Sequence, residues 1–224
     1  MASEQIRQGL ILMIGLIVSV GMHEFGHAIV AHKLGDPTPD SQGRVTVNPI
    51  AHMDPFGTLL IPALLIFSGA GMLFGWGRPV EISPRHFKRS ISMSLGDTLV
   101  SLAGPAMNIV LALFFTVALA VVFHFTKTNS GKGIFQLQRA LMLYIQLNLV
   151  LCLFNLLPIP PLDGSHLLFN HLSSKYNHIK QFLSNYGFYI LIALMIIPGV
   201  LSFIFKPVII ISRILIQLAY TLGG

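Results

Sequence analysis

The chain has 224 residues, of which 54% are apolar and only 10% charged, and its formal net charge at pH 7 is +6. Its apolar stretches approach or exceed the ~20 residues that cross a ~30 Å hydrocarbon layer, which excludes an ordinary water-soluble domain. The basic residues stand in short loops and form no basic-aromatic patch, so membrane orientation explains them better than nucleic-acid binding. The single cysteine, Cys152, excludes an intramolecular disulfide.

The amino-terminal part predicts two spans separated by a polar segment. The first span is Gly9–Ala31, which we expect to be retained because His23-Glu24-Phe25-Gly26-His27 stands where a signal peptide has its cleavage site. The polar segment, Asp36–Pro55, contains the alternating run Arg44-Val45-Thr46-Val47, which is typical of a strand. It predicts a small membrane-associated β-hairpin after the first helix. The second span is Phe56–Trp76, followed by a basic loop, Gly77–Ser90.

The rest of the chain predicts further spans. Ile91–Phe125 is too long for one perpendicular crossing, and Pro105 predicts a tilted, kinked or partly re-entrant early part. Ala140–Leu157 is a fourth span, ending in the irregular segment Pro158–Gly164, and a polar loop runs from Ser165 to about Asn185. Two carboxy-terminal helices follow within 186–222: the span Tyr186–Phe205, then Val208–Leu222 as a short span or an interfacial helix.

The expected fold is therefore an all-α multi-pass membrane protein with about five to six transmembrane helices. It forms a single domain over residues 1–224, with its core in 9–170. Lys and Arg number seven in the loops assigned to the amino-terminal side and six in the others, which predicts no orientation.

Three ionisable residues in the first span predict chemistry. His23 and His27 are four residues apart, so a helix places both imidazoles on one face, where they can bind one metal ion. Glu24 lies close enough to act on a water held there, as in the His-Glu-x-x-His signature of zinc hydrolases. An accidental pattern would place three ionisable groups in an apolar helix, each costing at least ~2.5 kcal/mol when charged.

A catalytic zinc site needs a third protein ligand, and Asp163 is the candidate. It follows a broken helix with three prolines, and irregular backbone at membrane depth is tolerated only where it is buried in protein or lines a wet cavity. The alternative is that Pro158–Gly164 is a simple turn at the membrane surface.

Three segments together carry a family resemblance. They are His23-Glu-Phe-Gly-His27, Ala103-Gly-Pro-Ala-Met-Asn108 and Asn155-Leu-Leu-Pro-Ile-Pro-Pro-Leu-Asp163-Gly164. In order and spacing they resemble the signature segments of the site-2 protease family of intramembrane zinc metalloproteases, over roughly residues 9–170. The segment Val47–Pro55 and the lack of a PDZ-like or CBS-like insertion resemble the compact members of that family.

The resemblance implies roles for particular residues. His23, His27 and Asp163 would bind one Zn²⁺ per chain, and Glu24 would be the general base. Asn108 and Asn155 are candidates for contacts with the substrate or with the developing oxyanion, or for interhelical hydrogen bonds alone. The implied activity is an intramembrane zinc endopeptidase that cuts transmembrane protein or peptide substrates in the lipid bilayer, in a prokaryotic cell membrane.

Several alternatives stay open at this point. The edge of Arg44, Val45, Thr46 and Val47 is a candidate for pairing with an unwound substrate. His52 and Asp54 either gate the site, bind a second ion or, as the sequence favours, stabilise a turn. The competing functions are a membrane metal-binding or transport protein, which would need ionisable groups along a continuous path, and an inactive protease-like scaffold.

Overall fold

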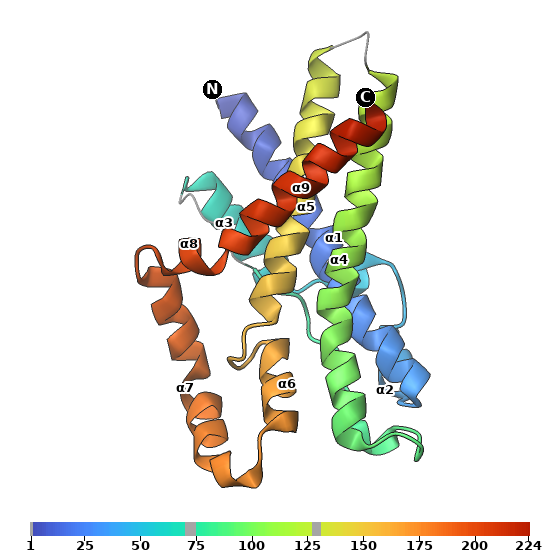
Figure 1. Cartoon of the computed structure of the whole chain (residues 1–224), viewed down its shortest axis with the longest axis vertical. Coiled ribbons are helices and arrows are strands. Elements are labelled where there is room, and N and C mark those ends of the chain that lie inside the picture. The colour runs from blue at the N-terminus through green and yellow to red at the C-terminus, as the bar shows by residue number, and fades with distance from the viewer. Residues whose placement is uncertain (1, 70–74, 127–130) are drawn as a thin grey trace.

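The computed structural model describes residues 2–69, 75–126 and 131–224, and most of this length is helical (Figure 1). The helices are α1 (Ala2–Leu34), α2 (Thr38–Ser41), α3 (Ile61–Phe67), α4 (Met93–Phe125), α5 (Lys132–Asn155), α6 (Asp163–His171), α7 (Asn177–Ile196), α8 (Val200–Ile204) and α9 (Lys206–Gly223). Short 3-10 turns stand at 49–52, 84–86 and 174–176, and a π-helical turn at 55–60.

Within the part of the chain that the structure describes, five helical segments are long and apolar enough to cross a membrane. They are Ile6–Leu34, Met93–Phe125, Lys132–Asn155, Ser174–Ile196 and Lys206–Gly223. The expected all-helical, multi-pass class is therefore confirmed for the described residues.

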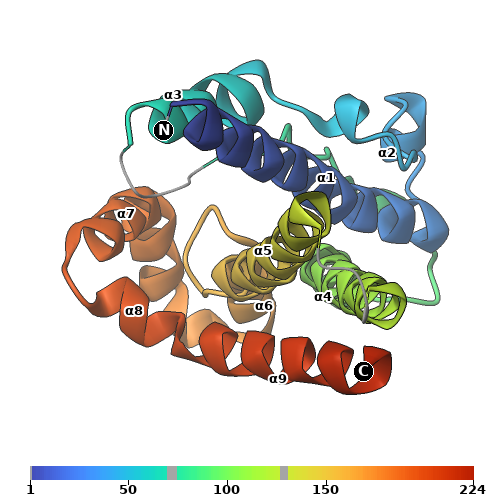
Figure 2. The ribbon, with the colours of Figure 1, turned by 90° about the horizontal axis from the view of Figure 1, so that it is seen from above.

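The long helix α4 is the centre of the bundle. It packs against α1, α5, α6 and α9, and Figure 2 shows α1 and α9 on opposite sides of the α4–α5 pair. Fully buried apolar side chains such as Leu119 and Ile145 fill the space between these helices. Pro105 lies inside α4 without ending it, so the region expected to bend or re-enter is one helix of 33 residues.

The predicted β-hairpin is wrong, because no strand occurs in the described residues and residues 45–47 form a bend. The Arg44 side chain is buried and its guanidinium donates hydrogen bonds to the carbonyls of Ala51, Arg78 and Pro79. The backbone therefore curves around a buried side chain. The alternating β-branched pattern gives no sign of this arrangement.

The described residues of the predicted second span, Phe56–Trp76, do not form one crossing helix. Helix α3 ends at Phe67, residues 70–74 lie outside the described residues, and the amide of Trp76 then donates to the carbonyl of Gly57 at 3.1 Å. The two ends of the apolar stretch are thus side by side. Hydropathy cannot separate such a re-entrant segment from a crossing one.

This return moves the basic loop to the other end of α1. The amide of Lys88 donates to the carbonyl of Leu34 at 2.8 Å, so the loop with Arg85, Lys88 and Arg89 lies beside the carboxy-terminal end of α1. The expected polar loop from Ser165 is also wrong, since α6 and the first turns of α7 occupy most of it.

Candidate metal centre

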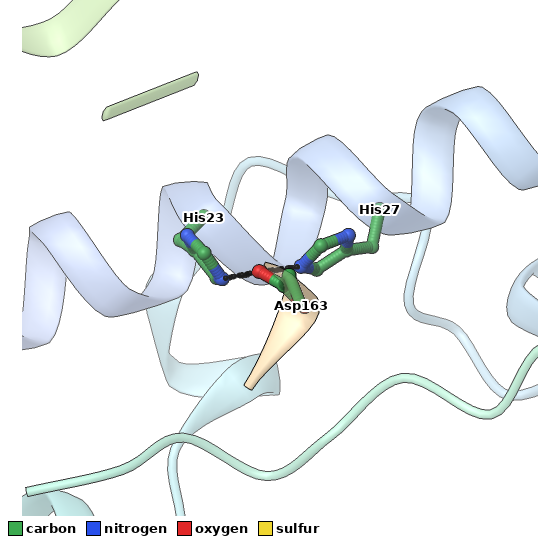
Figure 3. Close-up of side chains that lie close together, drawn as sticks. All are labelled: His23, His27 and Asp163. Atoms are coloured by element: carbon green, nitrogen blue, oxygen red, sulfur yellow. Dashed lines mark hydrogen bonds and ion pairs between the residues drawn. The ribbon is translucent and has the colours of Figure 1, made fainter. Parts of the chain in front are cut away.

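Two helices that are remote in sequence bring three ligating groups together. His23 and His27 stand one turn apart on α1, and Asp163 is the first residue of α6 (Figure 3). Oδ2 of Asp163 lies 3.2 Å from Nε2 of His23 and 3.3 Å from Nε2 of His27. Both histidines are buried, and the two Nε2 atoms are 3.1 Å apart.

The outer ring nitrogens fix the protonation of both imidazoles. Nδ1 of His27 lies 2.7 Å from the carbonyl oxygen of Val100, which only accepts, so Nδ1 carries the proton. Nδ1 of His23 donates to Oδ1 of Asn108 at 2.7 Å. In the neutral rings both Nε2 atoms therefore present lone pairs toward Asp163, whose buried Oδ2 faces no hydrogen-bond donor. Three lone-pair donors converge, an arrangement that a cation stabilises.

The spacing of these atoms suits zinc. Ligand atoms at ~2.0–2.1 Å from a tetrahedral Zn²⁺ are separated by about 3.3 Å, and the three observed separations are 3.1, 3.2 and 3.3 Å. Two imidazoles and one carboxylate are a donor set of catalytic zinc sites, which keep the fourth position open. The residues present thus fit a catalytic rather than a structural site.

Two glycines allow α4 to approach the metal-binding face of α1. A side chain at Gly104 would overlap both imidazoles, and one at Gly26 would come within 2.6 Å of the carbonyl oxygen of Ala103. The segment Ala103–Asn108 therefore contributes close helix packing in addition to the hydrogen bond between Asn108 and His23. Sequence reasoning noticed this segment but did not assign Gly104 a role.

A buried amide network holds Asn108. Its Nδ2 donates to the carbonyl of Ser19 at 3.2 Å and to Oδ1 of Asn148 at 3.0 Å, while Asn148 donates to Oγ of Ser19 at 3.0 Å. Because the Ser19 carbonyl only accepts, the amide orientation of Asn108 is fixed and its oxygen faces His23. Both N–H groups of Asn108 are occupied, which leaves neither for a substrate oxygen.

Sequence reasoning missed Ser19 and Asn148, which complete this network from α1 and α5. Both side chains are fully buried. Their position inside apolar spans is a signal in the sequence, since polar residues there usually form hydrogen bonds across helices. That signal does not identify the partner of each residue.

Glu24 faces the segment that follows the re-entrant stretch. The amide of Val80 donates to its Oε2 at 3.1 Å, and a side chain at Gly77 would lie 3.2 Å from its Cγ. Residues 77–80 thus lie against Glu24, and the Val80 amide holds one of its two carboxylate oxygens. Nothing in the sequence linked Val80 to this residue.

The remaining candidates lie in other surroundings. Asn155 donates back to the carbonyl of Leu151 on its own helix at 2.9 Å. Asp54 accepts from the amides of Phe56 and Gly57, as expected for a residue that stabilises a turn. His52 is fully buried with its Nε2 3.0 Å from the carbonyl of Thr46, and burial lowers the pKa of its ring.

A site of two buried imidazoles on a helix long enough to span a bilayer, completed by a carboxylate from a short neighbouring helix, defines a membrane-embedded metalloenzyme. The sequence model of the family described as "Peptidase family M50" matches residues 11–198. The chain therefore belongs to the M50 family, the site-2 protease family that its motifs resemble, and it is a zinc metalloprotease.

Individual relatives agree with this assignment. The chain is 41% identical over 187 residues to the Bacillus subtilis (strain 168) protein named "Putative zinc metalloprotease YwhC", covering 84% of this chain and 80% of that protein. It is 30% identical over 199 residues to "Putative zinc metalloprotease Rip2" of Mycolicibacterium smegmatis, covering 89% and 71%. The Rip2 of Mycobacterium tuberculosis (strain H37Rv) is 30% identical over 194 residues. No solved structure gives a significant match.

Proposed function

We propose that this protein is an intramembrane zinc endopeptidase that hydrolyses peptide bonds in or near the transmembrane helices of other proteins. The observation that carries the proposal is the meeting of three lone-pair donors: His23 and His27 lie on α1, a helix long and apolar enough to span a membrane, and Asp163 approaches them from the short helix α6. A metal site at this depth acts on peptide bonds that a soluble protease cannot reach.

The proposed division of labour follows from the contacts. His23, His27 and Asp163 would hold one zinc ion, which when bound would supply a Lewis acid and lower the pKa of a water molecule toward ~7. Glu24 takes the proton from the attacking water and returns it to the leaving amine. The amide of Val80 keeps one oxygen of Glu24 in place, and Asn108 keeps Nε2 of His23 turned toward the centre.

The two competing functions fit the structure less well. A metal transporter needs ligating groups along a path, whereas the described residues place three metal-binding side chains in one group only. An inactive scaffold needs no catalytic glutamate, whereas His23, Glu24, His27 and Asp163 are all present. A measurement of metal transport in liposomes would separate the first alternative from a protease.

The distribution of basic residues supports an orientation. Arg85, Lys88, Arg89 and Lys33 lie at the carboxy-terminal end of α1, while Arg7, Lys132 and Arg139 surround one cavity at its amino-terminal end. Positively charged loops stay in the cytoplasm. We therefore place the carboxy-terminal end of α1 on the cytoplasmic side of a bacterial cell membrane, the side from which Asp163 and α6 approach the site.

The test uses the full chain in detergent with a fluorogenic transmembrane peptide. Glu24→Gln keeps the size of the side chain and an oxygen that accepts from Val80, but it removes the base. We expect bound zinc to remain and the cleavage rate to fall by about 10²–10⁴-fold. The matched control is Glu81→Gln, an exposed glutamate that contacts Gln42, with unchanged cleavage expected. Equal cleavage by wild type and Glu24→Gln would reject the proposal.

A further inference from the structure

A group of polar side chains connects α4 to α6 next to the metal centre. Oδ2 of Asp97 accepts hydrogen bonds from Nδ2 of Asn170 at 2.7 Å and from Nδ1 of His166 at 3.2 Å. Nδ2 of Asn170 also lies 3.3 Å from Oγ1 of Thr98. These four residues, Asp97, Thr98, His166 and Asn170, are called the α4–α6 brace below.

Two residues of the brace and the ligand Asp163 belong to the same short helix, α6. His166 and Asn170 follow Asp163 by three and seven residues, so all three lie on one side of α6. Helix α6 has nine residues, fewer than the ~12–15 at which an isolated helix becomes even marginally stable in water. The irregular segment 156–162 precedes it. The position of Asp163 therefore depends on what α6 packs against.

We propose that Asp97 is a positioning residue that holds α6, and with it Asp163, at the distance from His23 and His27 that zinc binding requires. This inference rests on the proposed metal site. In this proposal, residues of α4 determine the positions of all three ligands. Asn108 orients His23, the carbonyl of Val100 orients His27, and Asp97 positions Asp163, although α4 supplies no ligand itself.

The geometry of the brace allows substitutions to distinguish a positioning role of Asp97 from a role of its negative charge. Both bonds reach the same oxygen of Asp97, so Asp97→Asn can present its single carbonyl oxygen to Asn170 and His166. Asp97→Ala removes both bonds. A role in positioning predicts that Asn substitutes for Asp, whereas a role through negative charge predicts that Asn and Ala are equally damaging.

The experiment measures zinc affinity of the purified full chain by competition with a chelator, together with thermal unfolding of the zinc-free protein. For Asp97→Ala we expect the zinc Kd to rise by about 10–100-fold, the usual effect of losing a group that orients a ligand. Asp97→Asn should stay close to wild type. Asn170→Ala, which loses the shorter bond, is the second variant and should also raise the Kd.

The matched control is Thr116→Ala. Thr116 is a buried residue of the same helix whose hydroxyl bonds to the carbonyl of Ala112, and the variant should keep the wild-type zinc Kd. A wild-type Kd for Asp97→Ala with a lower unfolding temperature would reduce the brace to a stabilising contact and overturn the inference. Equal losses in Asp97→Asn and Asp97→Ala would also overturn it. Absence of zinc binding in the wild type would instead reject the proposed function.

Discussion

The metal centre and the covering segment, residues 36–69 and 75–83 beside α1, are held together in different ways. In the centre, side chains bond to partners on other helices, as His23 does with Asn108 and Asn170 with Asp97. In the covering segment, buried side chains bond to the backbone of an irregular chain, as Arg44 does with the carbonyl of Pro79 and Asp36 with the amide of Ser83. The first arrangement depends on helix packing. The second gives an irregular chain a defined path without regular secondary structure.

This comparison predicts that the largest losses of zinc affinity follow from changes in helix packing at the metal centre. Gly104→Ala would place a methyl group on both imidazoles, so either α4 moves away or the histidines turn. We expect the zinc Kd to rise by at least about 100-fold, more than the loss of an outer contact produces. Zinc titration checks this. Gly133→Ala, at a helical glycine with open space around it, is the control, and a wild-type Kd for Gly104→Ala would contradict the packing account.

The second prediction concerns the amide network. Asn108→Ala leaves Nδ1 of His23 without its acceptor and releases the orientation of the ring. The zinc Kd should rise by about 10–100-fold, and the free energy of unfolding should fall by ~1–3 kcal/mol because buried polar groups lose their partner. Asn148→Ala, one contact further from the metal, should produce the smaller change in zinc Kd. The reverse ranking would contradict the order of contacts.

A third change targets the point where the covering segment meets the centre. Val80→Pro removes the amide hydrogen that Glu24 accepts, while Val80→Ala keeps it. A hydrogen bond to a charged group contributes ~1.5–3 kcal/mol, so kcat should fall by about tenfold or more in the proline variant. Zinc content should be unchanged in both. Loss of zinc in Val80→Pro would mean that the covering segment also supports the ligands.

The smallest expected effect is a pH dependence in the covering segment. Burial alone would raise the pKa of Asp36, but hydrogen bonds from Thr38 and Ser83 outweigh it and hold the pKa below its ordinary value. The carboxylate therefore adds stability above the unfolded pKa of about 4, and this contribution is lost as pH falls through the lower folded pKa. Unfolding of the zinc-free protein should lose stability less steeply below pH ~4 in Asp36→Asn than in wild type. Identical slopes would contradict this.

The two regions also differ in how well the sequence predicts them. His23, Glu24 and His27 share a helix, and the proline-rich segment before Asp163 is distinctive, so these residues are found from their spacing and type. Asn148 stands in an ordinary apolar run, and its meeting with Asn108 depends on how α4 and α5 pack. The sequence identifies the candidate ligands because they carry local signals. It does not name the residues that orient them.

The structure of the covering segment differs from the sequence-based prediction for a related reason. The β-branched pattern at 44–47 predicted a strand, but the buried guanidinium of Arg44 bends the chain instead. The apolar stretch 56–76 predicted a span, but Trp76 returns to Gly57. In both places one long-range contact overrides a local pattern. The polar residues after Ser165 predict a loop, whereas the structure has α6 there, and the packing of α6 on α4 has no local signal in the sequence.

X-ray absorption at the zinc edge of the purified protein tests the central claim most directly. The account predicts one zinc per chain with two imidazole nitrogens and further oxygen ligands at about 2.0–2.2 Å, and no sulfur. His23→Ala and His27→Ala should each lose one imidazole or the metal. A sulfur ligand would point to Cys152, the single cysteine of the chain, and would contradict a centre made by His23, His27 and Asp163. An unchanged spectrum in both variants would contradict it as well.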